Sequence, residues 1–235
     1  MNILDNVYMI VMSDNPVSRA HRNRALHSWK RNGITPILFE ATTPTYMDQG
    51  YGKELVFAEN KLSKGAKKSG VKPFTPTEKA VWCSHFRLWQ KCYNSGIPLI
   101  VIEHDIKLRK PIDFSFLKEN IDHYVIPLCQ TRIKGVPKIR AVLPGGAYFI
   151  TPNVAKRLIV QTLHVIKERG GIACNSDHMI NRHALNVKNK DRKAKFKYVC
   201  CEQNIVDELG VTVDHGKGVD FTETNFDEFN YLLLT

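Results

Sequence analysis

Residues 7–41 read VYMIVMSDNPVSRAHRNRALHSWKRNGITPILFEA, and this stretch decides the fold. The run VYMIVM at its start is short and fully apolar, as expected for a buried strand. Asn15 can cap a helix that has Pro16 at its first position and stops at Gly33. The segment TPILFEA then predicts a second strand. A strand, a helix and a strand in this order predict a parallel sheet with a helix packed on it.

The rest of the chain continues this alternation. Residues 74–96 predict a helix in which Thr75 and Glu78 form a capping box, and residues 97–108, IPLIVIEHDIKL, predict the strand after it. Further strands are expected in HYVIPLC, GGAYFI and KYVCCEQNI, and further helices after Thr151 and near Ser176. Residues 43–72 look irregular. We expect one α/β domain over residues 1–235.

The composition sets limits on function. Apolar residues make up 43% of the chain, which allows a sizeable core, and the net charge of +11 favours polyanionic partners such as nucleic acid, anionic lipid or a phosphorylated glycan. Solubility alone is the plainer interpretation of the charge. The six cysteines show neither C-x-x-C nor zinc-ligand spacing, so we expect reduced, buried thiols in a cytoplasmic protein. We also expect no signal peptide and no transmembrane segment.

Two lysine-rich segments, KLSKGAKKSGVK and VKNKDRKAKFK, are the strongest local concentrations of positive charge. Lysines on loops can follow a phosphate backbone without reading its sequence. If the partner is DNA, we expect contacts from Lys61, Lys64, Lys67, Lys68, Lys188, Lys190, Arg192 and Lys193.

The strand predicted in residues 97–108 runs into three ionisable residues, Glu103, His104 and Asp105. Ligands of open α/β sheets bind outside the carboxyl ends of the strands. Because side chains alternate along a strand, Glu103 and Asp105 should point one way and His104 the other. The two carboxylates could hold a divalent cation. The alternative is a strand end with solvated charges.

Other candidates also have plain structural interpretations. His85 lies on the apolar face of its helix, where it is a catalytic candidate or a hydrogen-bonded core histidine, and Glu78 lies two turns earlier, where it is a catalytic candidate or a cap. Gly145 and Gly146 would let the backbone approach a sugar or phosphate closely, or they form a turn. Asp177 is a candidate general base or a helix-opening carboxylate.

Taken in order from Val7 to Gln203, these segments resemble glycosyltransferase family 25, the group containing lipooligosaccharide and collagen galactosyltransferases. The most specific match is the Thr-Pro-x-Glu…Cys-x-x-Ser-His helix, carried by Thr75, Glu78, Cys83, Ser84 and His85. LIVIEHDIKL resembles the family's strand ending in Glu-Asp-Asp, with His104 in place of the middle Asp, and SDHMI resembles its following Asp segment.

The resemblance implies a GT-A-like fold, a Rossmann-type mixed sheet flanked by helices. Residues 1–105 would bind a UDP-sugar, often with Mn²⁺ or Mg²⁺, and residues 106–235 would face the acceptor. Transfer would invert the anomeric carbon. The implied roles are catalysis by Asp177, Glu78 and His85, donor binding by Arg19, Glu103, Gly145 and Gly146, and metal binding by Asp105 and His104.

The resemblance does not name the acceptor. The charge favours a hydroxymethylated cytosine in phage DNA, modified in the cytoplasm of the bacterial host. The alternative is a lipopolysaccharide core sugar, approached from the membrane surface, and a protein or small glycan is less favoured. A nucleic-acid-binding protein that has lost catalysis is the non-enzymatic hypothesis, for which His104 is the main support.

Overall fold

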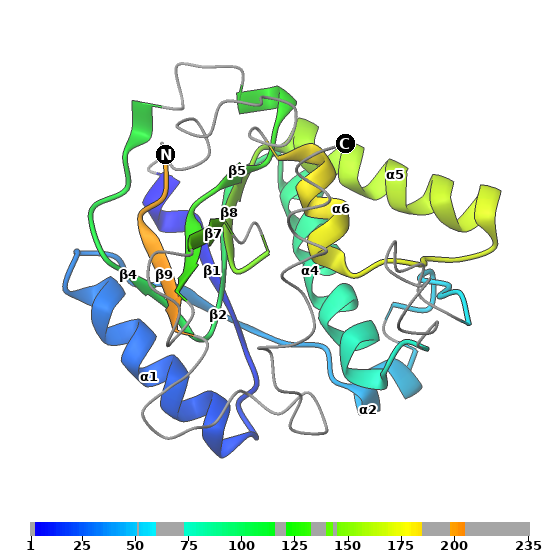
Figure 1. Cartoon of the computed structure of the whole chain (residues 1–235), viewed down its shortest axis with the longest axis horizontal. Coiled ribbons are helices and arrows are strands. Elements are labelled where there is room, and N and C mark those ends of the chain that lie inside the picture. The colour runs from blue at the N-terminus through cyan, green and yellow to red at the C-terminus, as the bar shows by residue number, and fades with distance from the viewer. Residues whose placement is uncertain are drawn as a thin grey trace.

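The computed structural model describes residues 3–50, 52–59, 73–115, 121–132, 140–142, 145–184 and 198–204. Its centre is a five-stranded sheet in the order β2-β1-β3-β8-β5 (Figure 1). These strands are β2 Ile37–Glu40, β1 Val7–Val11, β3 Leu99–Glu103, β8 Ala147–Ile150 and β5 Ile126–Pro127. β1 is parallel to β2 and β3, whereas β8 is antiparallel to β3 and β5, so the sheet is mixed.

A smaller sheet in the order β4-β9-β6-β7 packs beside the central sheet. Its strands are β4 Ile106–Leu108, β9 Cys201–Asn204, β6 Cys129–Arg132 and β7 Arg140–Val142. β4 follows β3 after a two-residue turn, so the chain changes sheets at the end of the strand that carries Glu103.

Helices cover both faces of the central sheet (Figure 1). The long α4 and α5, with the shorter α6, pack on one face, and α1 packs on the other beside the small sheet. Their bounds are α1 Pro16–Lys30, α2 Pro44–Asp48, α4 Pro76–Ser95, α5 Pro152–Arg169 and α6 Ser176–His183, with short 3-10 helices at Ile3–Asn6 and Ile121–His123.

The alternation of side chains along β3 divides the core in two. Leu99 and Val101 belong to the cluster under α4, and Ile100 and Ile102 belong to the cluster under α1. Continuing the alternation directs Glu103 toward α4. The single ionisable residue of the strand is therefore placed on the face covered by α4, α5 and α6.

The helix ends follow the predicted capping chemistry. The Asn15 side chain accepts a hydrogen bond from the Ser18 N–H, and Thr75 and Glu78 form both halves of a capping box. α4 ends at Gly96, whose φ of +67° lies in the left-handed region that glycine adopts without strain. Because α4 begins and ends at fixed residues, the register of its buried face is fixed as well.

The predicted fold class is confirmed: the chain forms a single-domain α/β structure with a Rossmann-like mixed sheet flanked by helices. Three local predictions were wrong. Residues 97–108 form two strands in different sheets, β3 and β4, joined by a turn at His104 and Asp105, rather than one strand. HYVIPLC forms two short strands, β5 and β6, rather than one, and the segment expected to be irregular contains α2. Thr43 caps α2 and Pro44 occupies its first turn, so the sequence did carry the signal.

Some predictions fall on residues outside the described ranges. These include Lys61, Lys64, Lys67, Lys68, Lys188, Lys190, Arg192 and Lys193. All six cysteines are described and free, as expected; only Cys174 is not fully buried. No helix in the described part of the chain has the length and apolar character needed to cross a membrane.

Candidate active site

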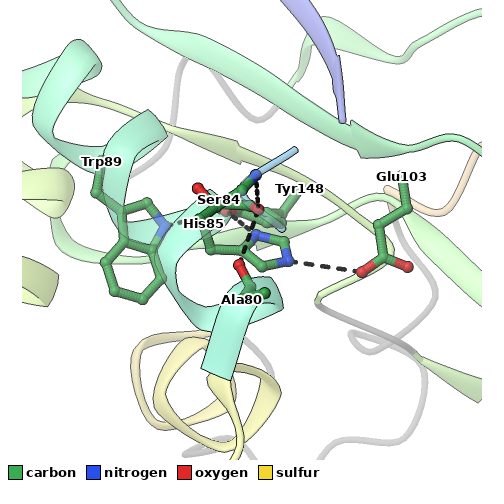
Figure 2. A network of polar contacts seen from close by, with 7 residues as sticks. Ala80, Ser84, His85, Trp89, Glu103 and Tyr148 are labelled. Atoms are coloured by element: carbon green, nitrogen blue, oxygen red, sulfur yellow. Dashed lines mark hydrogen bonds and ion pairs between the residues drawn. The ribbon is translucent and has the colours of Figure 1, made fainter. Parts of the chain in front are cut away.

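Glu103 lies at the carboxyl end of β3, opposite Ile10 of the parallel strand β1. Its backbone N–H donates to the Gly146 carbonyl at 2.9 Å, which fixes the end of the strand against the turn before β8. The Glu103 side chain keeps 27% exposure, and its Oε1 lies 3.5 Å from Nε2 of the fully buried His85 (Figure 2). Glu103 is thus the group through which this cluster meets solvent.

His85 is hydrogen-bonded to Tyr148, which is in turn hydrogen-bonded to Trp89 (Figure 2). Its Nδ1 lies 2.9 Å from the Tyr148 hydroxyl, and the Trp89 indole N–H donates to the same hydroxyl at 3.0 Å. Trp89 follows His85 by one helical turn on α4, and Tyr148 comes from β8. All three side chains are fully buried. The predicted alternative of a hydrogen-bonded core histidine is therefore correct for Nδ1, while Nε2 faces Glu103.

The neighbouring Ser84 ties α4 to the chain leaving β2. Its Oγ accepts from the Thr42 N–H at 2.9 Å and donates to the Ala80 carbonyl at 2.9 Å (Figure 2). This pair of bonds positions the turn of α4 that carries His85.

Asp177 is brought to the same cluster by α6. The Trp82 indole N–H donates to the Cys174 carbonyl at 2.7 Å and so anchors the start of α6 to α4. The Asp177 carboxylate packs directly on the Cα of Gly145, where any β-carbon would overlap it. Gly145 therefore has a structural reason within this chain to be glycine, namely to make room for Asp177.

The electrostatics confirm that these groups are close together. Burial lowers the pKa of His85 to about 4, an effect that the charge of Asp177 partly offsets. Burial, and then the charge of Asp105, raises the pKa of Glu103. Burial, and then the charge of Glu103, raises the pKa of Asp177, whereas His85 and His178 lower it. Two carboxyl groups with increased proton affinity thus lie beside a neutral imidazole.

His104 and Asp105 form the turn after β3 and do not continue the strand. The His104 ring lies edge-on to His21 of α1, with ring centroids 6.3 Å apart. Asp105 is close enough to Glu103 for its charge to raise the pKa of Glu103. Among the described residues, no group of three or more His, Cys, Asp and Glu side chains is arranged to hold a metal ion. One or two carboxylates can hold such a cation together with substrate phosphates, so metal binding by Asp105 and His104 stays a prediction.

The remaining predicted residues have separate environments. Glu78 caps α4, accepting from the Thr75 N–H at 2.9 Å. The exposed Arg19 donates to the Ser13 carbonyl at 3.2 Å, just beyond the carboxyl end of β1. Gly146 packs against Ile106. None of these three has a described contact with His85 or Asp177.

Sequence reasoning missed Tyr148 and Trp89 as parts of the site. The signal for Trp89 is its position four residues after His85, which puts both side chains on one helix face. Tyr148 lies in the apolar run AYFI, and only the pairing of β3 with β8, which sets Tyr148 opposite Val101, shows that it approaches the site.

Comparison with known families agrees with this geometry. The family model described as glycosyltransferase family 25 (LPS biosynthesis protein) matches residues 4–132, which is more than half of the 235-residue chain. A search of curated proteins gave no match. The matched region contains β1, α1, α4 and β3, with both His85 and Glu103. The chain therefore belongs to glycosyltransferase family 25.

Proposed function

We propose that this glycosyltransferase moves a sugar from a nucleotide-sugar to an acceptor hydroxyl with inversion at the anomeric carbon. The observation that carries the proposal is the convergence of Glu103, Asp177 and His85 at the carboxyl end of the parallel strands β1 and β3. This is the end of an open α/β sheet where ligands bind.

Asp177 is the proposed general base. The acceptor oxygen attacks the anomeric carbon, its proton passes to the Asp177 carboxylate, and the bond from the anomeric carbon to the nucleoside diphosphate breaks as the diphosphate leaves. A raised pKa makes Asp177 a better proton acceptor as long as it is ionised at the working pH. Packing against Gly145 holds its carboxylate in one position.

Glu103 and Arg19 are the proposed donor-binding groups. The partly exposed carboxylate of Glu103 can accept hydrogen bonds from sugar hydroxyls. Arg19 presents a permanent positive charge beyond β1, near the end of the sheet where a diphosphate would lie. Arg19, together with lysines, is assigned to the negative charge of the leaving group.

A lipopolysaccharide core sugar is the favoured acceptor, because the matching family is described by lipopolysaccharide biosynthesis. Hydroxymethylated DNA is the second candidate, supported by the net charge of +11 and by the two lysine-rich segments. Either acceptor carries phosphates that a basic surface would attract.

One assay panel tests donor and acceptor together. UDP-glucose, UDP-galactose and a UDP-pentose are each offered with truncated lipopolysaccharide, hydroxymethylated DNA and unmodified DNA, and products are identified by mass spectrometry. We expect transfer to lipopolysaccharide. Transfer to hydroxymethylated DNA alone would replace the favoured acceptor with the second one. The absence of both sugar transfer and donor hydrolysis would refute the proposed enzymatic activity.

A further inference from the structure

A chain of hydrogen bonds runs through the core behind Glu103. It begins at the Trp89 indole, passes through the Tyr148 hydroxyl to His85 Nδ1, and ends at the imidazole Nε2, 3.5 Å from Glu103 Oε1 (Figure 2). The first three side chains have no solvent exposure. Only Glu103, at the end of the chain, is open to a ligand.

The direction of each hydrogen bond follows from the inventory of donors. An indole N–H can only donate, so the Tyr148 oxygen accepts from Trp89. The buried phenol proton then needs an acceptor, and in the described structure the available one is His85 Nδ1. A neutral imidazole that accepts at Nδ1 carries its proton at Nε2, which lies 3.5 Å from Glu103 Oε1 and makes no hydrogen bond in this structure.

The opposite arrangement leaves a buried group unsatisfied. If Glu103 were protonated and donated to Nε2, His85 would carry its proton on Nδ1 and donate to Tyr148. The phenol oxygen would then accept two hydrogen bonds, and its own proton would have no acceptor within the core. The favoured tautomer also leaves a donor unsatisfied in this structure, at Nε2, but a small movement of the partly exposed Glu103 would give Nε2 an acceptor. The buried phenol proton would gain no such partner, and a buried donor without a partner costs more than a typical hydrogen bond contributes.

We propose that Trp89 and Tyr148 are positioning residues that fix His85 as the Nε2–H tautomer, so that His85 holds the Glu103 carboxyl group in place for a sugar hydroxyl. The role of Glu103 rests on the proposed function. In this arrangement His85 is a fixed hydrogen-bond donor and does not accept the acceptor's proton, which leaves Asp177 as the base. The three buried residues act only through Glu103.

The tautomer can be measured without any substrate. In protein labelled with ¹⁵N at histidine, we expect His85 to show a protonated Nε2 and an unprotonated Nδ1 near neutral pH. A His85→Gln variant assigns the signals by their loss. A proton on Nδ1 in the unsubstituted protein would overturn the proposal, whatever the outcome of the acceptor panel.

Substitutions in the hydrogen-bonded series Trp89–Tyr148–His85, called the relay below, test its function. Tyr148→Phe removes the donor to Nδ1 without changing the ring, so we expect part of the His85 population to shift to the Nδ1–H tautomer. The KM for the donor sugar should rise about 2- to 10-fold, the effect of one weakened hydrogen bond, with a smaller change in kcat. Tyr8→Phe, on β1 of the same sheet with β3 between it and β8, is the matched control.

Trp89→Phe gives a second, independent variant. It removes a hydrogen bond to the Tyr148 oxygen but leaves the phenol O–H donating to His85 Nδ1, so the Nε2–H tautomer should persist and the donor KM should change less than in Tyr148→Phe. A folded Tyr148→Phe protein with an unchanged tautomer and an unchanged donor KM would contradict the relay. Because the tautomer is read without substrate, a failure of the proposed function remains distinguishable from a failure of the relay.

Discussion

The two faces of the central sheet bury the same kinds of apolar side chains but differ in the groups placed among them. The face under α4 contains His85 and Tyr148 and ends at Glu103. The face under α1 includes the thiols of Cys129, Cys200 and Cys201, with the last two sulfur atoms 3.7 Å apart. Titratable groups with shifted pKa values occur on both faces. Among the described residues, those on the α4 face lie at the carboxyl end of parallel strands, the end at which ligands of open α/β sheets bind. The position of the titratable groups at a strand end, more than their burial, distinguishes the candidate site from the rest of the core.

The largest expected effect is the loss of the proposed base. Asp177→Asn keeps the volume and packing on Gly145 but cannot take a proton. Transfer should fall about 10²- to 10⁴-fold, the usual contribution of general base catalysis, with the melting temperature kept or raised. Steady-state kinetics and thermal unfolding check both parts. Activity within a few-fold of the unsubstituted enzyme would remove Asp177 from the base role.

Displacing the Asp177 carboxylate should have the next largest effect on the rate of transfer. In Gly145→Ala the new methyl group overlaps Asp177 and displaces it, and a shift of about 1 Å can cost about 10²-fold in rate. Gly146→Ala is the matched control, because its methyl group meets the flexible end of Ile106 at 3.1 Å and the Cys129 sulfur at an ordinary contact distance of 3.7 Å. Gly145→Ala should add little to the loss in an Asp177→Asn background. Full additivity of the two losses would show that Gly145 acts elsewhere.

The pH dependence of the free energy of unfolding should differ between a variant of the buried His85 and a variant of an exposed histidine. The pKa of His85 is lowered from 6.5 to about 4 by burial, so its contribution to stability is fully present above pH 6.5 and is lost as the pH falls through about 4. This loss is on the order of 3 kcal/mol. Denaturant unfolding at several pH values should show a shallower acid dependence in His85→Gln than in the unsubstituted protein. His27→Gln, at an exposed position on α1, controls for loss of an imidazole, and equal acid slopes in both variants would be the contrary result.

On the opposite face, a substitution should affect stability alone. Cys201→Ala removes one buried sulfur and should lower the free energy of unfolding by about 1 kcal/mol without changing kcat or the donor KM. Urea unfolding and steady-state kinetics measure the two quantities. A large kinetic effect would mean that the α1 face also takes part in the reaction, and the contrast between the faces would fail.

The smallest expected effect concerns Glu78, which shares α4 with His85. Glu78→Ala loses half of the capping box and should destabilise the protein by about 0.5 to 1 kcal/mol, while Glu78→Gln retains most of the cap. Neither change should alter kcat if Glu78 only caps the helix. A large drop in kcat for Glu78→Gln with stability intact would restore the catalytic role that the sequence suggested.

Much of the fold could be predicted from local signals. Asn15, Thr75 and Thr151 each precede a proline and cap the helix expected at that position, and the apolar runs became strands. The sequence also indicates Glu103, His85 and Asp177 as candidate site residues, each from its own local pattern. The sequence did not show which strands pair with each other in the sheet. Tyr148 reaches His85 only because β8 lies beside β3, and His104 leaves the site because a two-residue turn follows Glu103.

The Trp82–Cys174 hydrogen bond has a consequence for how such enzymes diversify. It joins the half of the chain matched by the family model to the half that carries Asp177, and its acceptor is a backbone carbonyl. Every amino acid supplies that carbonyl, so the residue at this position can change freely while the anchor remains. Chimeras that exchange the segment after residue 132 between relatives should therefore retain a correctly placed carboxylate when they preserve the backbone path of this loop, even if its side chains all differ.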